Sequence, residues 1–161
     1  MTAPTHSLVI PCYNEAANLP LLVARCRECF RGRGAEIVLV DNGSTDESPA
    51  VLKALLGNDA QIRSVRVEKN QGYGFGILSG LSAARGDVLG WTHADMQTDP
   101  ADFLKAAALF DAAPDPQHLF VKGRRRGRPV GDEIFTSGMA VFETFLLGRP
   151  LIDINAQPTV F

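Results

Sequence analysis

Short runs of β-branched and other apolar residues alternate, over the first 121 residues, with longer stretches whose apolar positions recur at helical spacing. A turn rich in Gly, Asn or Asp separates each run from the stretch that follows it. This order is typical of an α/β fold. Continuous apolar runs such as residues 37–40 favour parallel strands covered by helices on both faces. The expected strands are residues 8–11, 36–40, 62–68, 88–92 and 119–121.

Helices are expected between these strands and after the last of them. The first begins near Asn18, which can cap it, has Pro20 in its opening turn and ends at Gly32. The fourth begins at Asp99, a capping residue followed by proline. The second helix is expected after residues 44–49 and the third over about 75–85. A last helix is expected over 132–147, after a basic loop, and a short strand-like segment follows it at 151–154.

The composition is that of an ordinary globular domain. The chain has 161 residues, of which 45% are hydrophobic and 21% charged, with a net charge of −2, so we expect a single domain. Three cysteines (Cys12, Cys26 and Cys29) are too few for a disulfide framework and favour a reducing, cytoplasmic compartment. No apolar run approaches the ~18 residues of a membrane span, so we expect a soluble protein or one peripheral to a membrane.

The charge is unevenly distributed. Five basic residues lie close together (Lys122, Arg124, Arg125, Arg126 and Arg128), just before the apolar stretch 132–147. No aromatic residue interleaves with them, which argues against nucleic acid as a partner. A basic loop beside an apolar helix suits peripheral contact with anionic lipid headgroups at the inner face of the cytoplasmic membrane. The alternative is a solvated loop beside a helix that packs on the sheet.

Acidic residues follow three of the expected strands. Glu15 comes after the first strand, Asp41 after the second and Asp95 after the fourth. In a parallel α/β sheet, ligands bind beyond the carboxyl ends of the strands. Turn and capping chemistry can explain any one of these acids, but it has no need to place them at the same edge of the sheet. We therefore expect Asp41 and Asp95 to meet in one cleft.

A glycine-rich segment at residues 72–76 follows the third strand and precedes a helix. It does not fit the dinucleotide-binding pattern, because the last glycine of that pattern would fall on Ile77. The chain has no P-loop either. We interpret the segment as a turn, and we interpret Gly76 and Gly80 as positions of close packing on one helix face.

These residues suggest a nucleotide whose base and ribose contact acids and amides, with its diphosphate near Asp95. A divalent cation would neutralise the repulsion between Asp95 and the diphosphate. Oxygen ligands favour Mg²⁺ or Mn²⁺ for this position.

Four segments carry a resemblance to a known family: SLVIPCYNEAANLPLLV, IVLVDNGSTDES, EKNQGYGFGILSGLSAARGDVLGWTHADMQTDP and DINAQP. The chain resembles the family 2 glycosyltransferases, in the branch of dolichyl-phosphate mannosyltransferase and bacterial polyprenyl-phosphate sugar transferases. The resemblance implies a nucleotide-diphospho-sugar transferase fold of the GT-A type, with a mostly parallel central sheet and helices on both faces. It also implies an inverting sugar transfer.

By this resemblance, residues 1–121 form the nucleotide-sugar-binding part and residues 122–161 an acceptor-side appendage. Asp41 would meet the base, and Asp153 would serve as a base or orient its neighbours. The other residues implied are Pro11, Tyr13 and Glu15 at the nucleoside, Asn70 and Gly72 at the nucleotide, Asp95 and Gln97 at the metal and diphosphate, and Lys122 and Arg124 at the diphosphate or the acceptor phosphate.

Two features depart from the family pattern. His93 stands where the family usually has the first acid of an Asp-x-Asp motif. A neutral imidazole ligates Mn²⁺ better than Mg²⁺, and the alternative for His93 is a hydrogen bond to a neighbour. The chain also ends at Phe161, where many relatives continue, which leaves open whether it carries the whole acceptor site.

The sequence thus predicts a glycosyltransferase that moves a sugar from a UDP- or GDP-linked donor to a polyprenyl-phosphate or related lipid-phosphate acceptor. Lipid phosphate is already anionic at pH 7 and needs no base, whereas a sugar hydroxyl needs a positioned carboxylate. Two alternatives remain: a transferase with a saccharide hydroxyl as acceptor, and a nucleotide-sugar-binding module without catalysis.

Overall fold

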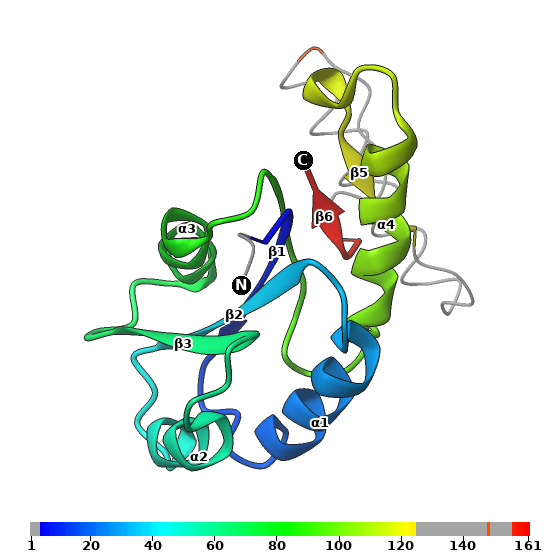
Figure 1. The fold of residues 1–161 in the computed structure, drawn as a ribbon. Helices are drawn as coiled ribbons and strands as arrows, with labels where there is room; N and C mark the ends of the chain where they lie inside the picture. Colours follow the sequence, from blue (N-terminus) through cyan, green and yellow to red (C-terminus); the bar gives the residue numbers. More distant parts are fainter. Residues whose placement is uncertain (1–3, 125–147, 149–155) are drawn as a thin grey trace, which may run out of the picture.

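The computed structural model describes residues 4–124, 148 and 156–161, and its elements follow the α/β order expected from the sequence (Figure 1). The helices are α1 (Leu19–Phe30), α2 (Ser48–Leu56), α3 (Tyr73–Ala83) and α4 (Ala101–Ala112), with a 3-10 turn at Pro116–His118. The strands are β1 (His6–Cys12), β2 (Ala35–Asn42), β3 (Ile62–Val67), β4 (Val88–Trp91), β5 (Val121–Lys122) and β6 (Thr159–Val160). The predicted helix at 132–147 and strand at 151–154 lie outside the described residues.

The described strands form one six-stranded sheet in the order β3-β2-β1-β4-β6-β5. The pairs formed by β1, β2, β3 and β4 are parallel, whereas β6 is antiparallel to both β4 and β5. Since β6 reverses direction between them, β4 and β5 run the same way and their carboxyl ends share one edge. The mostly parallel sheet is confirmed.

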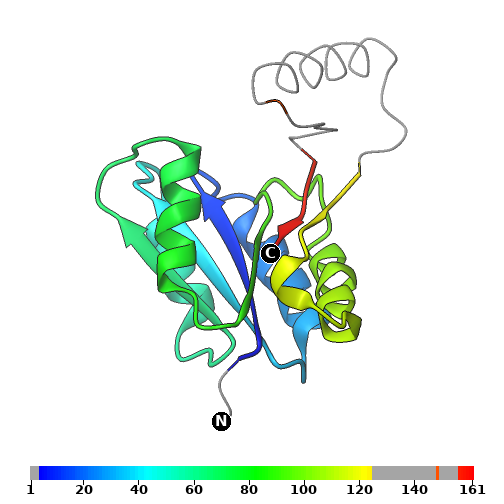
Figure 2. The same cartoon turned by 90° about the horizontal axis from the view of Figure 1, so that it is seen from above.

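Helices cover both faces of the sheet, as Figures 1 and 2 show. On one face, α1, α2 and α4 bury a large core around Phe30, Leu52 and Phe103. On the other face, α3 packs over a smaller cluster that contains Val9, Val38 and Val40. Every residue of β2 is buried, as expected for a central strand with a helix layer on each side.

Glycines let α3 approach the sheet. A Cβ atom at Gly80 would lie 2.3 Å from Val9 Cγ1 and 2.7 Å from Val40 Cγ2, which is closer than atoms in a packed core can come. The predicted close packing at Gly76 and Gly80 is therefore confirmed. Gly86, expected to end this helix, lies three residues beyond its end at Ala83. There its missing Cβ makes room for the backbone of His6.

Some boundaries and caps differ from those predicted. Asn18 has helical backbone angles and makes no side-chain cap hydrogen bond to α1, since a capping residue usually has non-helical ones. Its Nδ2 donates to Glu15 Oε2 at 2.6 Å. Asp99 does accept a hydrogen bond from the backbone N–H of Ala101, at 2.9 Å. The strand β6 was not predicted. Two residues long, it depends on pairing with β4 and β5, which a local pattern does not reveal.

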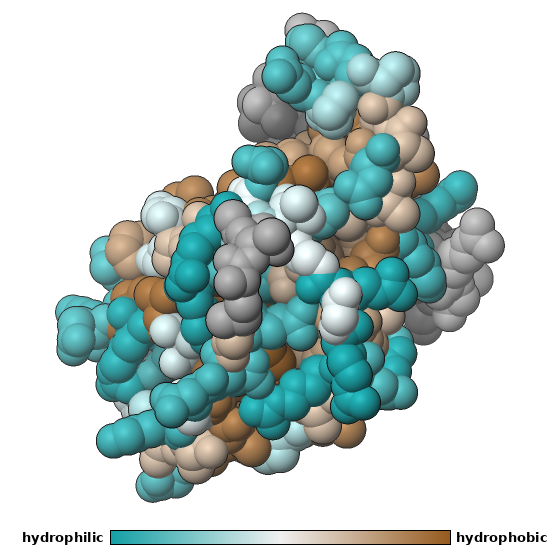
Figure 3. All heavy atoms as spheres, viewed as in Figure 1, coloured by the Kyte–Doolittle hydropathy of each residue, from teal (hydrophilic) through white to brown (hydrophobic). Residues whose placement is uncertain are grey.

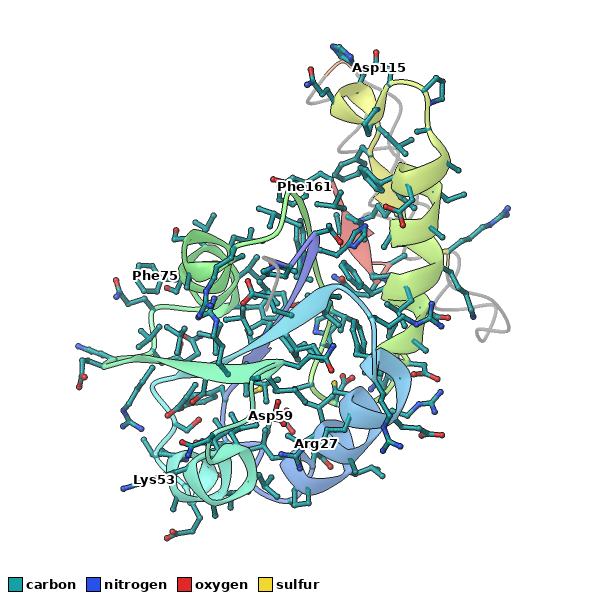
Figure 4. All side chains as sticks on the ribbon, in the orientation of Figure 1. Arg27, Lys53, Asp59, Phe75, Asp115 and Phe161 are labelled. Carbon is teal, nitrogen blue, oxygen red and sulfur yellow. The ribbon has the colours of Figure 1, made fainter. Side chains whose placement is uncertain are left out.

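Ion pairs join elements that lie far apart in the chain. Glu36, buried at the start of β2, accepts hydrogen bonds from Ser7 Oγ, Arg63 Nε and the backbone N–H of Arg85. Burial opposes its ionisation, but these donors outweigh that effect and lower the pKa of Glu36. Arg27 of α1 pairs with Asp59, which follows α2, at 3.0 Å (Figure 4).

The surface in Figure 3 mixes hydrophilic and hydrophobic residues, with hydrophobic ones visible over both α3 and α4. Phe75 and Leu78 of that helix are 40% and 63% exposed. Within the described ranges, no helix is long and apolar enough to cross a bilayer.

Candidate functional site

A cavity of about 280 Å³ opens where β1, β2 and β4 end and α3 begins. This is the edge at which a parallel α/β sheet binds its ligands. Its lining residues come from those strand ends and from the segment before α3: Pro11, Cys12, Tyr13, Glu15, Asn42, Asn70, Gly72, Tyr73, His93, Ala94 and Asp95. The fold therefore brings together the acidic and amide residues of segments that are far apart in the sequence.

The loop after β1 is held in place by the loop after β2. The backbone N–H of Asn14 donates to Ser44 Oγ at 3.0 Å, and that of Glu15 donates to Ser48 Oγ at 2.9 Å. Asp46 Oδ2 accepts from the backbone N–H of Ala16 at 3.2 Å. The polar residues of the second loop thus stabilise the cavity rim. Tyr13 is left 45% exposed at that rim, an open aromatic surface beside the cavity.

At the end of β2, Asp41 and Asn42 differ in their surroundings. Asp41, expected to meet the base, does not line the cavity. It lines a groove of about 390 Å³ between α2 and β3, where its carboxylate accepts from Arg66 Nη1 at 2.6 Å and from the backbone N–H of Ser44 at 2.9 Å. The reason is the alternation of side chains along a strand, which assigns the cavity to Asn42.

Asn42 is buried, with 3% of its surface exposed. Its Nδ2 donates to the carbonyl oxygen of Gly72 at 3.0 Å, and its Oδ1 has no hydrogen-bond partner in the described part of the chain. A buried acceptor without a partner is costly. Beside a cavity it indicates a position that a ligand N–H or O–H would complete.

Asp95 and His93 lie beyond the end of β4. Asp95 Oδ1 accepts from the backbone N–H of Gln97 at 3.0 Å. The ring of His93 stacks on that of Tyr73, with centroids 5.0 Å apart and an interplanar angle of 13°. Burial and the negative charge of Asp95 raise the pKa of Tyr73 to about 12, so its hydroxyl is neutral at physiological pH. Among the described residues, His93 has the ring stack with Tyr73 and no hydrogen bond of the kind considered from the sequence.

A divalent cation needs a suitable set of ligand atoms. The ranges that the structure describes hold no group of three His, Cys, Asp or Glu side chains that could ligate a metal. Mg²⁺ in nucleotide sites takes one or two carboxylates and completes its shell with phosphate oxygens and water. Asp95 and His93 fit such a site when a diphosphate supplies the remaining ligands.

The structure brings most of the predicted site residues to this cavity: Pro11, Tyr13, Glu15, Asn70, Gly72, His93 and Asp95. Gln97 contacts Asp95 through its backbone but does not line the cavity. Lys122 contacts Thr159 Oγ1 at 3.5 Å on the neighbouring strand, and Arg124 is exposed. Lys122 is the last residue of β5 and Arg124 comes two residues later, and neither lines the cavity. Asp153 lies outside the described residues.

Four further residues line the cavity that the sequence did not single out: Cys12, Asn42, Tyr73 and Ala94. Asn42 could have been found from strand alternation, because Asp41 and Asn42 lie on opposite faces of β2. Tyr73 was read as part of a turn, and only the approach of β4 to α3 places it against His93.

Comparison with known families settles the relationship. The model of "Glycosyl transferase family 2" matches residues 7–149. The chain belongs to this family. The fold and the position of the cavity at the carboxyl edge of the sheet agree with the resemblance drawn from the sequence.

Among curated proteins, this family member is 41% identical over 99 residues to undecaprenyl-phosphate 4-deoxy-4-formamido-L-arabinose transferase of Pseudomonas paraeruginosa (strain DSM 24068 / PA7), covering 60% of this chain and 29% of the relative. The enzyme of the same name from Salmonella paratyphi B (strain ATCC BAA-1250 / SPB7) is 35% identical over 108 residues, or 65% of this chain and 33% of the relative. The chain spans about a third of these relatives.

Solved structures of glycosyltransferases share the fold. The mannosyltransferase PcManGT from Pyrobaculum calidifontis, in complex with GDP-Man and Mn²⁺, superposes with a TM-score of 0.64 at 25% identity, over 78% of this chain and 37% of that one. TarS of S. aureus in complex with UDP-GlcNAc gives a TM-score of 0.55 at 22% identity, over 78% of this chain and 36% of that one. The GT-A fold expected from the sequence is confirmed.

Proposed function

We propose that this chain is the catalytic part of a glycosyltransferase that moves a sugar from a nucleoside diphosphate donor to a lipid phosphate. The observation that carries the proposal is the cavity itself. It combines an exposed aromatic ring (Tyr13), a buried acceptor without a partner (Asn42) and a carboxylate (Asp95) at one sheet edge. An aromatic ring can stack on a base, a free acceptor can receive a hydrogen bond from the nucleoside, and a carboxylate can hold a diphosphate through a divalent cation.

On the donor side, we assign contact with the base to Asn42, the role that was expected of Asp41. Its Nδ2 already donates to the carbonyl oxygen of Gly72, whereas Oδ1 has no partner among the described residues and can accept a hydrogen bond from a ligand. An acceptor of this kind suits the imide N–H of uracil, which is a single donor between two carbonyls. Tyr13 provides a ring on which the base can stack. We therefore favour a UDP-linked donor over a GDP-linked one.

At the diphosphate, Asp95 and His93 would hold Mg²⁺ or Mn²⁺ together with phosphate oxygens. When bound, the cation neutralises charge on the departing nucleoside diphosphate. Lys122 ends β5 and Arg124 follows it, at the same edge as the end of β4. Basic side chains form strong, charge-assisted hydrogen bonds to phosphate. We assign them to the acceptor phosphate.

The lipid acceptor is supported by the names of the curated relatives, which are undecaprenyl-phosphate sugar transferases. A phosphate monoester is already ionised at pH 7. It can therefore attack the anomeric carbon from the side opposite the leaving group, which inverts the configuration. No catalytic base is needed, so the proposal does not depend on Asp153.

A transfer assay tests this function. The chain is mixed with UDP- and GDP-sugars, and nucleoside diphosphate release is measured with polyprenyl phosphate, with a glycan, or without acceptor. Release stimulated by polyprenyl phosphate alone is expected. Asp95→Asn should lower the rate by about 10²-fold, the usual cost of losing one group that stabilises charge in the transition state.

Asp102→Asn is the matched control. Asp102 is an acid of α4 that pairs with Lys105 at 2.6 Å, so its loss should leave the rate unchanged. Stimulation by the glycan instead would favour the saccharide-acceptor alternative. Tight UDP binding without turnover on any acceptor would favour the binding module.

A lipid acceptor places the enzyme at a membrane surface, and we propose contact through the basic segment 122–128 at the inner face of the cytoplasmic membrane. Each Lys or Arg near an anionic surface is worth about 1 kcal/mol. Replacing Arg124, Arg125 and Arg126 with glutamine should reduce sedimentation with anionic vesicles and leave sedimentation with neutral vesicles unchanged. Equal sedimentation of the variant and the unmodified chain with anionic vesicles would remove this part of the proposal.

A further inference from the structure

The pairing of Tyr73 with His93 points to a role that the family comparison does not assign. We propose that Tyr73 is a positioning residue, which fixes the plane of the His93 ring so that the imidazole meets the cation and diphosphate of the donor. We also propose that this pair makes the site select Mn²⁺ over Mg²⁺. The inference rests on the proposed function, because it needs a nucleoside diphosphate in the cavity.

The two rings come from different elements. Tyr73 is the first residue of α3, and His93 lies two residues after the end of β4. Their rings lie nearly parallel, at 13°, with centroids 5.0 Å apart, within the range of favourable aromatic pairs. Both residues line the cavity that also contains Asp95. The stack therefore joins the start of α3 to the segment that carries the carboxylate.

Stacking orients His93 without using its nitrogens. A hydrogen bond to a neighbour would hold the imidazole through one ring nitrogen and occupy it. In the described part of the chain, neither Nδ1 nor Nε2 of His93 has such a partner, and the recorded contact is through the ring face. The in-plane nitrogens thus stay available to a ligand, and the ring plane is set by Tyr73.

The chemistry of the available donors determines the preferred cation. Asp95 supplies one carboxylate, whereas His93 can supply only a nitrogen. Imidazole is a better ligand for transition metals than for Mg²⁺, which prefers oxygen. A site built from one carboxylate, one imidazole and phosphate oxygens should therefore bind Mn²⁺ more tightly than Mg²⁺.

The test measures Mn²⁺ binding by electron paramagnetic resonance, with and without UDP or GDP, and Mg²⁺ binding by competition. Tyr73→Ala should weaken Mn²⁺ binding to the nucleotide complex by about 2- to 13-fold, the range expected for loss of one aromatic pair. It should also lower the ratio of Mn²⁺ to Mg²⁺ affinity. Tyr73→Phe keeps the ring and should retain both values. His93→Asp should shift the preference toward Mg²⁺.

Phe75→Ala is the matched control, because Phe75 is another exposed aromatic residue of α3 (Figure 4) that does not line the cavity. It should change neither affinity. Unchanged Mn²⁺ binding in Tyr73→Ala would overturn the inference. So would a loss of nucleotide affinity that is equal with and without metal, since that result would make Tyr73 only a wall of the cavity. If the unmodified chain binds neither UDP nor GDP, the proposed function itself fails, and this inference fails with it.

Discussion

Replacing Asn42 with alanine should weaken nucleotide binding without destabilising the unliganded protein. Among the described residues, the side chain of Asn42 makes one hydrogen bond, from Nδ2 to the carbonyl oxygen of Gly72 at 3.0 Å. Its Oδ1 is buried and has no partner among the described residues. The substitution therefore removes one made hydrogen bond and one unsatisfied acceptor together.

The two effects on folding have opposite signs. Losing the hydrogen bond costs about 0.5–1.5 kcal/mol, whereas removing a buried acceptor without a partner recovers about 1–3 kcal/mol. The free energy of unfolding should then change little. In the complex, a base N–H that faces alanine loses its acceptor, which costs about 1–3 kcal/mol or about 5- to 150-fold in affinity.

Isothermal titration calorimetry with UDP and urea unfolding measure the two quantities on the same preparations. Thr92→Val is the matched control, because Thr92 Oγ1 is also buried and has no partner in the part of the chain that the structure describes, but Thr92 does not line the cavity. It should leave UDP affinity unchanged and should not lower stability. If Asn42→Ala binds UDP as the unmodified chain does, Asn42 does not contact the nucleotide and the reasoning is refuted.

The remaining predictions concern stability. Four carboxyl groups have lowered pKa values, because the hydrogen bonds that they accept lower the pKa by more than burial raises it: Glu36, Asp46, Asp59 and Asp99. Their contribution to the free energy of unfolding is complete above the ordinary pKa values, 3.8 for Asp and 4.5 for Glu. It is lost as the pH falls through the lower pKa values of the folded state. The urea midpoint should therefore drop between pH 5 and pH 3, and an unchanged midpoint would contradict these assignments. Gly80→Ala should destabilise by about 1–3 kcal/mol through overpacking against Val9 and Val40. Gly74→Ala, on the same helix with open space around it, should leave the unfolding midpoint unchanged or raise it, and equal loss in both variants would argue against the packing explanation.

Much of the fold could be predicted because it depends on local patterns. The apolar runs fixed the four parallel strands to within a few residues, and the glycines at 76 and 80 marked the close contact of α3. Strand β6 depends on pairing with distant residues, such as that of Val160 with Gly90, seventy positions earlier. No local pattern encodes a partner at that distance.

The site could be predicted as a set of segments but not residue by residue. Strand ends were identified correctly, so Pro11, Glu15 and Asp95 do line the cavity. At the end of β2, two adjacent polar residues differ only in the face to which they point. The sequence does not say which face the cavity occupies; in the structure Asn42 lines the cavity and Asp41 lines the groove between α2 and β3.

The central claim is that the cavity beyond β1, β2 and β4 holds the nucleotide-sugar donor. A crystal structure of the chain with a UDP-sugar and Mn²⁺ tests it most directly. The nucleoside should lie against Tyr13 and Asn42, with the diphosphate beside Asp95. Density for the nucleotide in the groove between α2 and β3, beside Asp41 and Arg66, would contradict the account.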